Sequence, residues 1–302
     1  MALKDIKAKI VATKRMNTVT HAMEAVSAAK MRKTQEAAFA GRAYARAALA
    51  ILARLSGSAE VGRHPLTQVR EVKKTALVII TSDKGLAGAL NSGVIRAAVR
   101  ELGSRDKDSV VVYAYGRKGE EFFRRRGYEM ARAYENKRDD IALSEMQELS
   151  RDLSDGFLAG NFDEVVAVFS NFRSTFEQTP TVRRLLPLSV ESVSQIVQDI
   201  RPAKGKWSNE PVLTSPASYT VEPGADEVLG LLIPRLVAVS LYFMLLEAKA
   251  SEHSARMVAM KNASDKSKER VHDFTRLYNK LRQAAITREV SEIVGGREAL
   301  AS

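Results

Sequence analysis

The first 55 residues of this chain contain no proline and a single glycine, Gly41. Proline and glycine are the residues that most often interrupt helices, whereas alanine, which is frequent here, is the best helix former. The sequence therefore predicts one continuous helix from Leu3 to about Leu55. At about 1.5 Å per residue such a helix is about 80 Å long, far longer than the helices of ordinary globular domains.

Apolar residues recur along this helix at steps of three and four, in two sets. They are Leu3, Ile6 and Ile10, followed by Met16, Val19, Met23 and Val26. This spacing places each set on one helix face. The step from Ile10 to Met16 breaks a strict heptad, so we expect a narrow and locally irregular coiled-coil seam.

After the breaker-rich segment Ser56–Pro65 the pattern changes. Short apolar, β-branched runs now alternate with helical stretches, which is typical of a parallel sheet with helical crossovers. The expected strands are Thr75–Thr81, Ser109–Gly116 and Asp163–Phe172, with Thr179–Ser189 as an edge strand because it carries prolines near both ends. The expected helices are Ala89–Leu102, Glu120–Gly127 and Ser144–Ala159.

The C-terminal quarter is again helical. Residues 190–224 are rich in proline and glycine and indicate an irregular connection. A helix from about Ala225 to Glu298 follows, with Pro234 in its early turns. Its apolar start, Val228–Leu246, carries Arg235 and has an uncharged run of 11 residues, whereas a membrane span needs about 20, so we expect a helix buried in protein.

Later in this helix the apolar positions keep a three-four spacing. They are Val271, Phe274, Tyr278, Leu281 and Ala285, then Ile286, Val290 and Ile293, displaced by one position. Two long helices with narrow apolar stripes need a partner, and the simplest one is each other, in antiparallel orientation.

The fold expected is therefore α/β, a long antiparallel coiled coil of the two terminal helices with an inserted Rossmann-like domain. We divide the chain into an N-terminal helix (1–56), an α/β domain (57–224, with its sheet core at 70–190 and an irregular connection at 190–224) and a C-terminal helix (225–302).

Charge suggests acidic partners. The net charge is +11, and the first helix holds eleven basic and three acidic residues, a surplus of eight. A long helix with such unbalanced charge repels itself, so we expect it to face an acidic surface. The alternative is a basic coiled coil that binds nucleic acid or lipid, although no recognition module for nucleic acid is legible.

Few residues point to chemistry. The chain has no cysteine, which excludes disulfides and thiolate sites, and its four histidines (His21, His64, His253 and His272) are scattered, so we expect no metal site and no cofactor. The N-terminus is charged from residue 4, and we expect no signal peptide.

One turn resembles a phosphate-binding loop, because Thr81–Asn91 follows a strand and precedes a helix. A nucleotide-dependent enzyme using Asp83 is therefore a competing hypothesis. The spacing Gly85-x-x-Gly88 matches neither of the common nucleotide motifs, and a routine strand-to-helix turn is the favoured interpretation.

Two charged groups also have structural interpretations. The run Arg124–Arg126 is typical of a solvated helix face. Glu252 and Arg256 form an i,i+4 pair, whereas Glu252 and His253 are adjacent and do not face each other, so we predict no catalytic residue here.

Four segments in the same order resemble the gamma subunit of F-type ATP synthases of bacterial type. They are LKDIKAKIVATKRMNTVTHAMEAVSAAKMRK near the start, SDKGLAGALN in the middle, ASEHSARMVAMKNAS late in the chain and RQAAITREVSEIVGG near the end. The resemblance implies a non-catalytic rotor of the central stalk. Its helices would form the shaft inside a hexamer of alternating alpha and beta subunits, and its α/β domain would form a foot that binds the epsilon subunit and the membrane ring of c subunits.

The resemblance also assigns roles to residues. Met23, Lys30, Arg32 and Lys33 match the segment that passes acidic loops of the beta subunits. The positions expected to make polar contacts with the surrounding subunits are Arg256, Arg282, Gln283 and Thr287. Ile286, Val290 and Ile293 would turn in an apolar sleeve, and Tyr219 and Glu222 would lie nearest the c ring. The implied location is the cytoplasmic face of the bacterial inner membrane, with membrane association only through the complex and no nucleic acid bound.

Overall fold

The computed structural model describes residues 3–55, 63–139, 141, 143–189 and 224–301. These residues belong to two compact units: a helix-pair unit (residues 1–26 and 257–302) and a sheet unit (residues 27–256). Both long helices, α1 (Leu3–Leu55) and α7 (Ala225–Ala301), continue from one unit into the other, and their bounds agree with the predicted helices. The division of the chain at residues 56 and 224 stays a prediction, because the compact units cut through both helices.

The sheet unit contains a five-stranded sheet in the order β3-β2-β1-β4-β5. The strands are β1 (Thr75–Ile80), β2 (Val110–Tyr115), β3 (Glu129–Tyr134), β4 (Glu164–Ser174) and β5 (Glu177–Leu186). The first four are parallel to one another, and β5 pairs antiparallel with β4 at one edge. The predicted parallel sheet with an edge strand near Thr179–Ser189 is confirmed.

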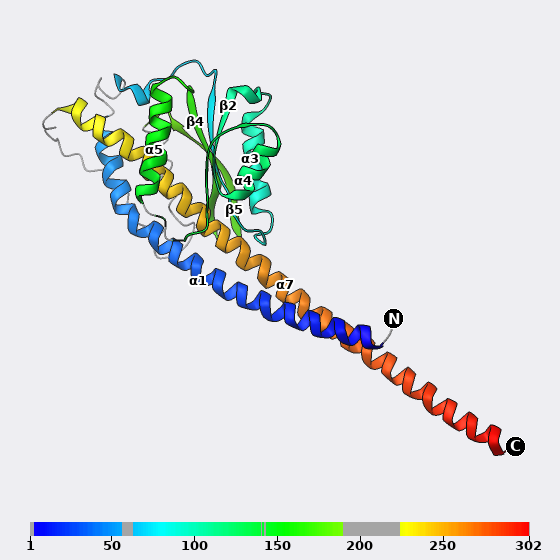
Figure 1. The fold of residues 1–302 in the computed structure, drawn as a ribbon. Helices are drawn as coiled ribbons and strands as arrows, with labels where there is room; N and C mark the ends of the chain where they lie inside the picture. The colour runs from blue at the N-terminus through cyan, green and yellow to red at the C-terminus, as the bar shows by residue number, and fades with distance from the viewer. Residues whose placement is uncertain (1–2, 56–62, 140, 142, 190–223, 302) are drawn as a thin grey trace. The chain divides into compact units, whose positions relative to one another are not determined.

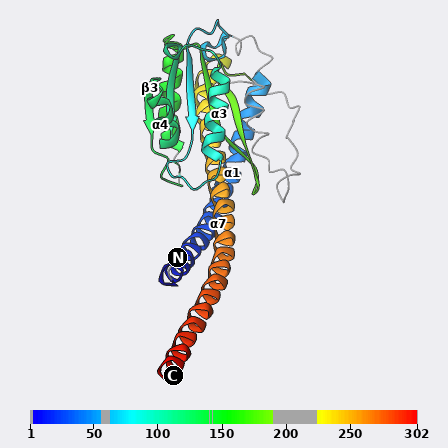
Figure 2. The same cartoon turned by 90° about the vertical axis from the view of Figure 1, so that its right-hand side faces the viewer.

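Helices cover both faces of this sheet (Figures 1 and 2). They are α3 (Leu90–Leu102) and α4 (Arg117–Arg125) on one face, with α5 (Leu143–Leu158) and the first half of α7 on the other. The side chains of β1 alternate between the two cores, since Val78 and Ile80 belong to the α5–α7 side and Leu77 and Ile79 to the α3–α4 side. A central parallel strand buried on both faces reads as a continuous apolar run, as Thr75–Ile80 does.

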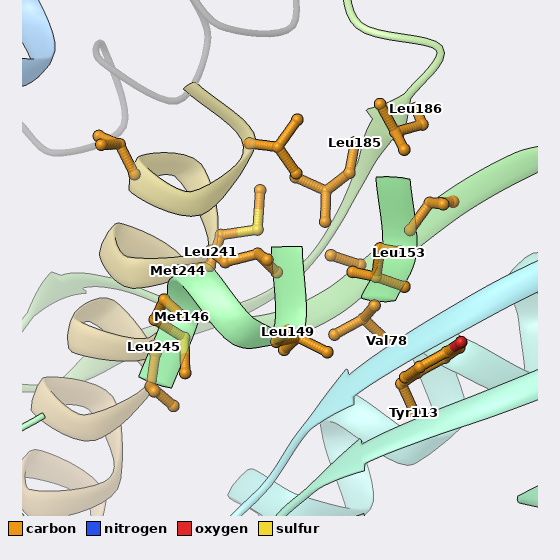
Figure 3. Packing of buried hydrophobic residues seen from close by; sticks show 14 of the residues in the cluster. Val78, Tyr113, Met146, Leu149, Leu153, Leu185, Leu186, Leu241, Met244 and Leu245 are labelled. Carbon is orange, nitrogen blue, oxygen red and sulfur yellow. The ribbon is translucent and has the colours of Figure 1, made fainter. Parts of the chain in front are cut away.

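The apolar start of α7 completes the core. Leu241, Met244 and Leu245 of α7 pack beside Met146 and Leu149 of α5 (Figure 3). Among the described residues, α7 is the one helix long and apolar enough by composition to cross a bilayer, and 61% of its most apolar window is buried inside the protein. This burial agrees with the prediction of a helix packed in protein.

Strand β3 was not predicted. It lies at the open edge of the sheet, and four of its six residues are exposed. Its sequence, EMARAY, carries a glutamate and an arginine and lacks the β-branched apolar residues that identify buried strands. An edge strand covered on one side only gives a weak sequence signal, so the pattern after the short helix does not predict this strand.

In the helix-pair unit, α1 and α7 run antiparallel (Figure 1) and meet along a seam that mixes apolar and polar residues. On α1 the less exposed positions are Ile6, Ile10, Thr13, Asn17 and Thr20. On α7 they are Met260, Ser264, Ser267, Val271, Phe274, Tyr278 and Leu281. The Nδ2 of Asn17 donates hydrogen bonds to the carbonyl oxygen of Ser264 at 2.7 Å and to its Oγ at 2.9 Å.

The predicted α1 seam is correct at Ile6 and Ile10, and Met23 is half-buried, but the prediction is wrong at Met16, Val19 and Val26. Met16, Val19 and Val26 are 59%, 58% and 54% exposed, so they lie on the outer face of the helix. The heptad does not break after Ile10; it continues through threonine and asparagine. The apolar spacing after Ile10 therefore indicates the wrong face of the helix, because the seam positions that follow are threonine and asparagine.

Candidate functional site

The turn after β1 is where a doubly wound sheet normally opens to a ligand. The chain passes from β1 to β2 through α3 on one face and from β3 to β4 through α5 on the other, so the strand order reverses between β1 and β4. Ligands of open α/β sheets bind at the carboxyl ends of the strands at such a reversal point. This crevice is the place to test the nucleotide hypothesis.

The turn itself is closed by its own side chains. The backbone N–H of Ser82 donates to Oδ1 of Asn91 at 3.0 Å, and the Nδ2 of Asn91 donates to Oγ of Ser82 at 2.7 Å. The Ser82 hydroxyl in turn donates to the carbonyl oxygen of Lys84 at 2.6 Å. The first turn of α3 is therefore tied to the end of β1 by Asn91.

Asp83, the residue proposed for a nucleotide-dependent enzyme, has structural partners. Its Oδ1 accepts from the backbone N–H of Arg117 at 2.8 Å, and its Oδ2 accepts from the backbone N–H of Asn136 at 2.9 Å. The Nδ2 of Asn136 donates to the carbonyl oxygen of Thr81 at 2.6 Å. The buried carboxylate of Asp83 thus fixes the start of α4 and the segment after β3 to the end of β1.

Charged side chains of α7 occupy the remaining space. The ammonium of Lys249, which is 1% exposed, donates to the carbonyl oxygen of Asn136 at 2.5 Å. Arg256 donates to Oε1 of Glu252 at 2.8 Å and to the carbonyl oxygen of Gly85 at 3.3 Å. The crevice where a nucleotide would bind is therefore filled by the protein's own helix, and the turn acts as a docking point for α7.

Sequence analysis did not single out Lys249. Burial lowers the pKa of this lysine, and the nearby carboxylates of Glu252, Asp139 and Asp83 oppose that shift. The available sequence signal was a lysine just after the apolar run that ends at Leu246, with Glu247 between them, which suggests a buried charge only once the helix is known to cross a sheet edge.

A second polar group joins three elements through Asp139, in the connection between β3 and α5. Its Oδ2 pairs with the ammonium of Lys30 on α1 at 2.7 Å, and its Oδ1 accepts from Nε2 of His253 on α7 at 2.7 Å. Burial alone would raise the pKa of Asp139, but the hydrogen bonds from Lys30 and His253 outweigh it and hold the pKa below its ordinary value. Asp139 is therefore a carboxylate at neutral pH.

His253 is neutral at pH 7. Burial lowers the pKa of His253, and this effect exceeds the opposing influence of Glu252 and Asp139. The tautomer that fits carries its proton on Nε2 and donates it to Asp139, while Nδ1 is buried with no hydrogen-bond partner within the described part of the chain. The arrangement suits a fixed structural contact.

Among the described residues, those that the family resemblance assigned to partner binding fall into three groups. Met23 is half-buried, whereas Arg32 and Lys33 are exposed on α1. Lys30 is partly exposed and already paired with Asp139, and Arg256 is buried in the sheet unit with its guanidinium used inside the chain. Tyr219 and Glu222 lie outside the described residues.

The third group lies near the end of α7. All residues from 282 to 294 are exposed. This segment holds Arg282, Gln283 and Thr287, together with the apolar residues Ile286, Val290 and Ile293, which are 51%, 53% and 68% exposed. An apolar stripe on a helix of which no other face is covered is the feature of this unit that most requires a partner.

The arginine run behaves as a solvated helix end. Arg124 pairs with Glu120 at 2.7 Å, and the guanidinium carbon of Arg126 lies 3.6 Å from the ring centroid of Phe122. All three arginines are exposed. Among the residues that the structure describes, no group of three or more His, Cys, Asp or Glu residues is placed to hold a metal ion.

Comparison with known proteins places these observations in a family. The family model described as "ATP synthase" matches residues 2–300. The ATP synthase gamma chain of Staphylococcus saprophyticus is 37% identical over 99% of both chains, and that of Roseiflexus castenholzii is 41% identical over 99% of this chain and 98% of its own.

Solved structures share the fold at lower identity. A chain of the central stalk and c-ring structure of the Tetrahymena thermophila mitochondrial ATP synthase is 23% identical, with a TM-score of 0.60 over 82% of this chain and 99% of its own. A chain of the Euglena gracilis mitochondrial enzyme is 16% identical, with a TM-score of 0.63 over 99% of this chain and 94% of its own. Because the family model and the bacterial relatives both span nearly the whole sequence, this chain belongs to the ATP synthase gamma chain family.

Proposed function

We propose that this chain is the rotor subunit of the central stalk of an F-type ATP synthase, which couples proton movement through the membrane ring to ATP synthesis or hydrolysis in the alpha–beta hexamer. The observation that carries the proposal is the exposed apolar stripe Ile286, Val290 and Ile293 on a helix end with no covered face. A surrounding apolar sleeve would bury this stripe while leaving it free to turn, because apolar contact has no directional bonds that rotation must break.

The subunit itself performs no bond chemistry in this proposal. The crevice at the carboxyl ends of the strands is filled by Lys249, Glu252 and Arg256, and Asp83 is used to hold two backbone N–H groups. This occupancy supports a mechanical role for the α/β domain, as the foot that carries the helices. The catalytic sites would then belong to the hexamer.

The exposed charges of α1 have a role in contact with the hexamer. Arg32 and Lys33, with Met23 nearby, would pass acidic loops of the beta subunits. Polar contacts with the surrounding subunits are assigned to Arg282, Gln283 and Thr287. Lys30 and Arg256 already form ion pairs inside the chain, with Asp139 and Glu252. Their contribution to contacts with the hexamer would therefore be reduced.

The foot would bind the epsilon subunit and the c ring, with Tyr219 and Glu222 nearest the ring. The complex would lie at the cytoplasmic face of the bacterial inner membrane, and this chain would associate with the membrane only through it. Torque reaches the catalytic sites because each rotor angle presents different contacts to each beta subunit, and differential contact energy is what biases one conformation over another.

Reconstitution tests the proposal. The purified chain is mixed with alpha and beta subunits, and assembly and ATPase activity are measured with and without it. Assembly of one copy per hexamer, with ATPase activity that depends on the chain, is the expected result. Binding of nucleotide by the chain alone, or salt-sensitive binding to DNA or anionic vesicles without binding to the subunits, would contradict it.

A further inference from the structure

In the part of α1 that belongs to the sheet unit and whose side chains the structure describes, residues 27–38, few apolar contacts reach the sheet core. Ala38 joins the main core cluster and Ala37 packs against it. By contrast, α7 supplies a long run of leucines, valines and methionines to the same cluster. Alanine buries little surface, so apolar packing of residues 27–38 gives this part of α1 little resistance to sliding or turning against the sheet.

The Asp139 carboxylate supplies a directional contact between the sheet unit and α1. One oxygen binds the Lys30 ammonium at 2.7 Å and the other binds Nε2 of His253 at 2.7 Å, so a single side chain of the sheet unit joins α1 and α7. Hydrogen bonds to a charged group are shorter and about twice as strong as neutral ones, and they fix direction as well as distance. The His253 side chain is 5% exposed and that of Asp139 is 19%, so both are largely shielded from water.

The segment that carries Asp139 is itself fixed to the sheet. Three residues before it, Asn136 donates its backbone N–H to Asp83 at 2.9 Å and its Nδ2 to Thr81 at 2.6 Å. Its carbonyl oxygen accepts from Lys249 at 2.5 Å. Force applied to either helix at this level is therefore passed to the end of β1 through the contacts of Asp139, the backbone of residues 136–139 and the hydrogen bonds of Asn136.

We propose that Asp139 is a positioning residue for rotary coupling, which locks α1 and α7 to the sheet unit so that torque passes between the foot and the helix pair. This inference rests on the proposed rotor function. Packing through Ala37 and Ala38 resists separation of α1 from the sheet but gives little resistance to its sliding, whereas α7 is also held by its own core side chains and by Lys249 and Arg256. The Lys30–Asp139–His253 bridge prevents the sliding of α1. Loss of the bridge would let α1 slip while the hexamer still hydrolyses ATP.

The test uses the whole complex in proteoliposomes, and it measures ATP hydrolysis and ATP-driven proton pumping in the same preparation. Asp139→Asn removes the charge of the bridge. The matched control is Asp152→Asn, which removes an ion pair with Arg132 at 2.9 Å that lies within the sheet unit and does not involve α1 or α7. His253→Leu is a second variant, which leaves the Lys30–Asp139 contact in place and removes the contact between Asp139 and α7.

A covalent bridge tests the mechanical interpretation directly. The chain has no cysteine, so Lys30→Cys combined with Asp139→Cys can be joined by a short bifunctional maleimide in the purified subunit before assembly. We expect the unbridged pair to hydrolyse ATP and to lose proton pumping, and the bridged pair to regain it. A merely structural role of Asp139 would not be restored by a tether between these two positions.

The outcomes are distinct. Loss of pumping with retained hydrolysis in Asp139→Asn and His253→Leu, but not in Asp152→Asn, supports the proposal, as does rescue by the bridge. Normal pumping in both bridge variants, equal loss in the control, or no rescue by the tether would overturn it. Failure of the unmodified chain to assemble with alpha and beta subunits would instead refute the rotor function, before any variant is compared.

Discussion

Replacing Ile286, Val290 and Ile293 together by serine is expected to weaken binding to the hexamer without destabilising the isolated chain. Full burial of such a side chain contributes about 1.5–3 kcal/mol. These residues are 51%, 53% and 68% exposed, so about half to two thirds of each contribution, roughly 2.5–6 kcal/mol for the three, is available only in a complex. Because about 1.4 kcal/mol corresponds to a tenfold change in the dissociation constant, this constant should rise roughly 100-fold to 10,000-fold.

The assay is a titration of labelled chain with preformed alpha–beta hexamer at fixed salt, together with thermal unfolding of the chain alone. Serine also lowers helix propensity, so the control replaces Arg288, Glu289 and Glu292, which are exposed on the same segment, by serine. The control should bind within about tenfold of the original chain, because surface charges contribute little. If the variant with serine at Ile286, Val290 and Ile293 binds as tightly as this control, the prediction that an apolar sleeve surrounds these residues is refuted.

Three further changes have defined outcomes. Arg32→Glu combined with Lys33→Glu should lower coupled ATP synthesis in vesicles and leave the circular dichroism of the chain unchanged, since both side chains are exposed; unchanged synthesis would remove the role assigned to them. Burial lowers the pKa of His253 below its ordinary value of 6.5, so at a pH just below 6.5 the unfolded state binds more protons than the folded state. The free energy of unfolding should therefore fall as the pH drops below about 6.5. His253→Gln should reduce this dependence on pH in denaturant titrations. Gly116→Ala should destabilise the sheet unit by several kcal/mol in the same titrations. The glycine has a φ of 106°, and an added Cβ would lie 2.0 Å from the carbonyl oxygen of Thr81. A loss of stability below about 1 kcal/mol would contradict this prediction.

Local patterns were sufficient where each element buries an apolar face. The runs at Thr75–Ile80 and Val110–Tyr115 are buried on both sides, and their strands were found within a residue or two. The long helix ending at Leu55 was recognised because nothing before it interrupts a helix. Edge strand β3 was missed for the opposite reason, because its exposed side gives no apolar alternation.

The polar contacts of the sheet unit could not be deduced in the same way. Lys249 and Asn136 are 113 residues apart, and Arg256 and Gly85 are 171 apart, so their meeting depends on where α7 crosses the carboxyl end of the sheet. Periodicity specifies the face of a helix but not its axial position on a sheet. The sequence could therefore suggest a phosphate-binding turn, and only the tertiary structure shows that α7 occupies it.

The helix-pair unit has polar residues in part of its seam and apolar residues on its outer face, and this distribution bears on function. Its seam holds Asn17, Thr20 and Ser264 between apolar positions such as Ile10 and Phe274, while Val19 and Val26 face outward. An isolated helix pair gains most stability by burying its apolar residues in the seam. The polar part of the seam gives up some of that stability, and outward apolar residues lower the solubility of a chain that works alone. Both features are favourable only if a third surface covers the outer face for most of the protein's lifetime. The outer apolar residues are therefore best explained as part of the contact with the hexamer, and the hydrogen bonds of Asn17 as the means by which the pair keeps its register while that contact changes with rotation.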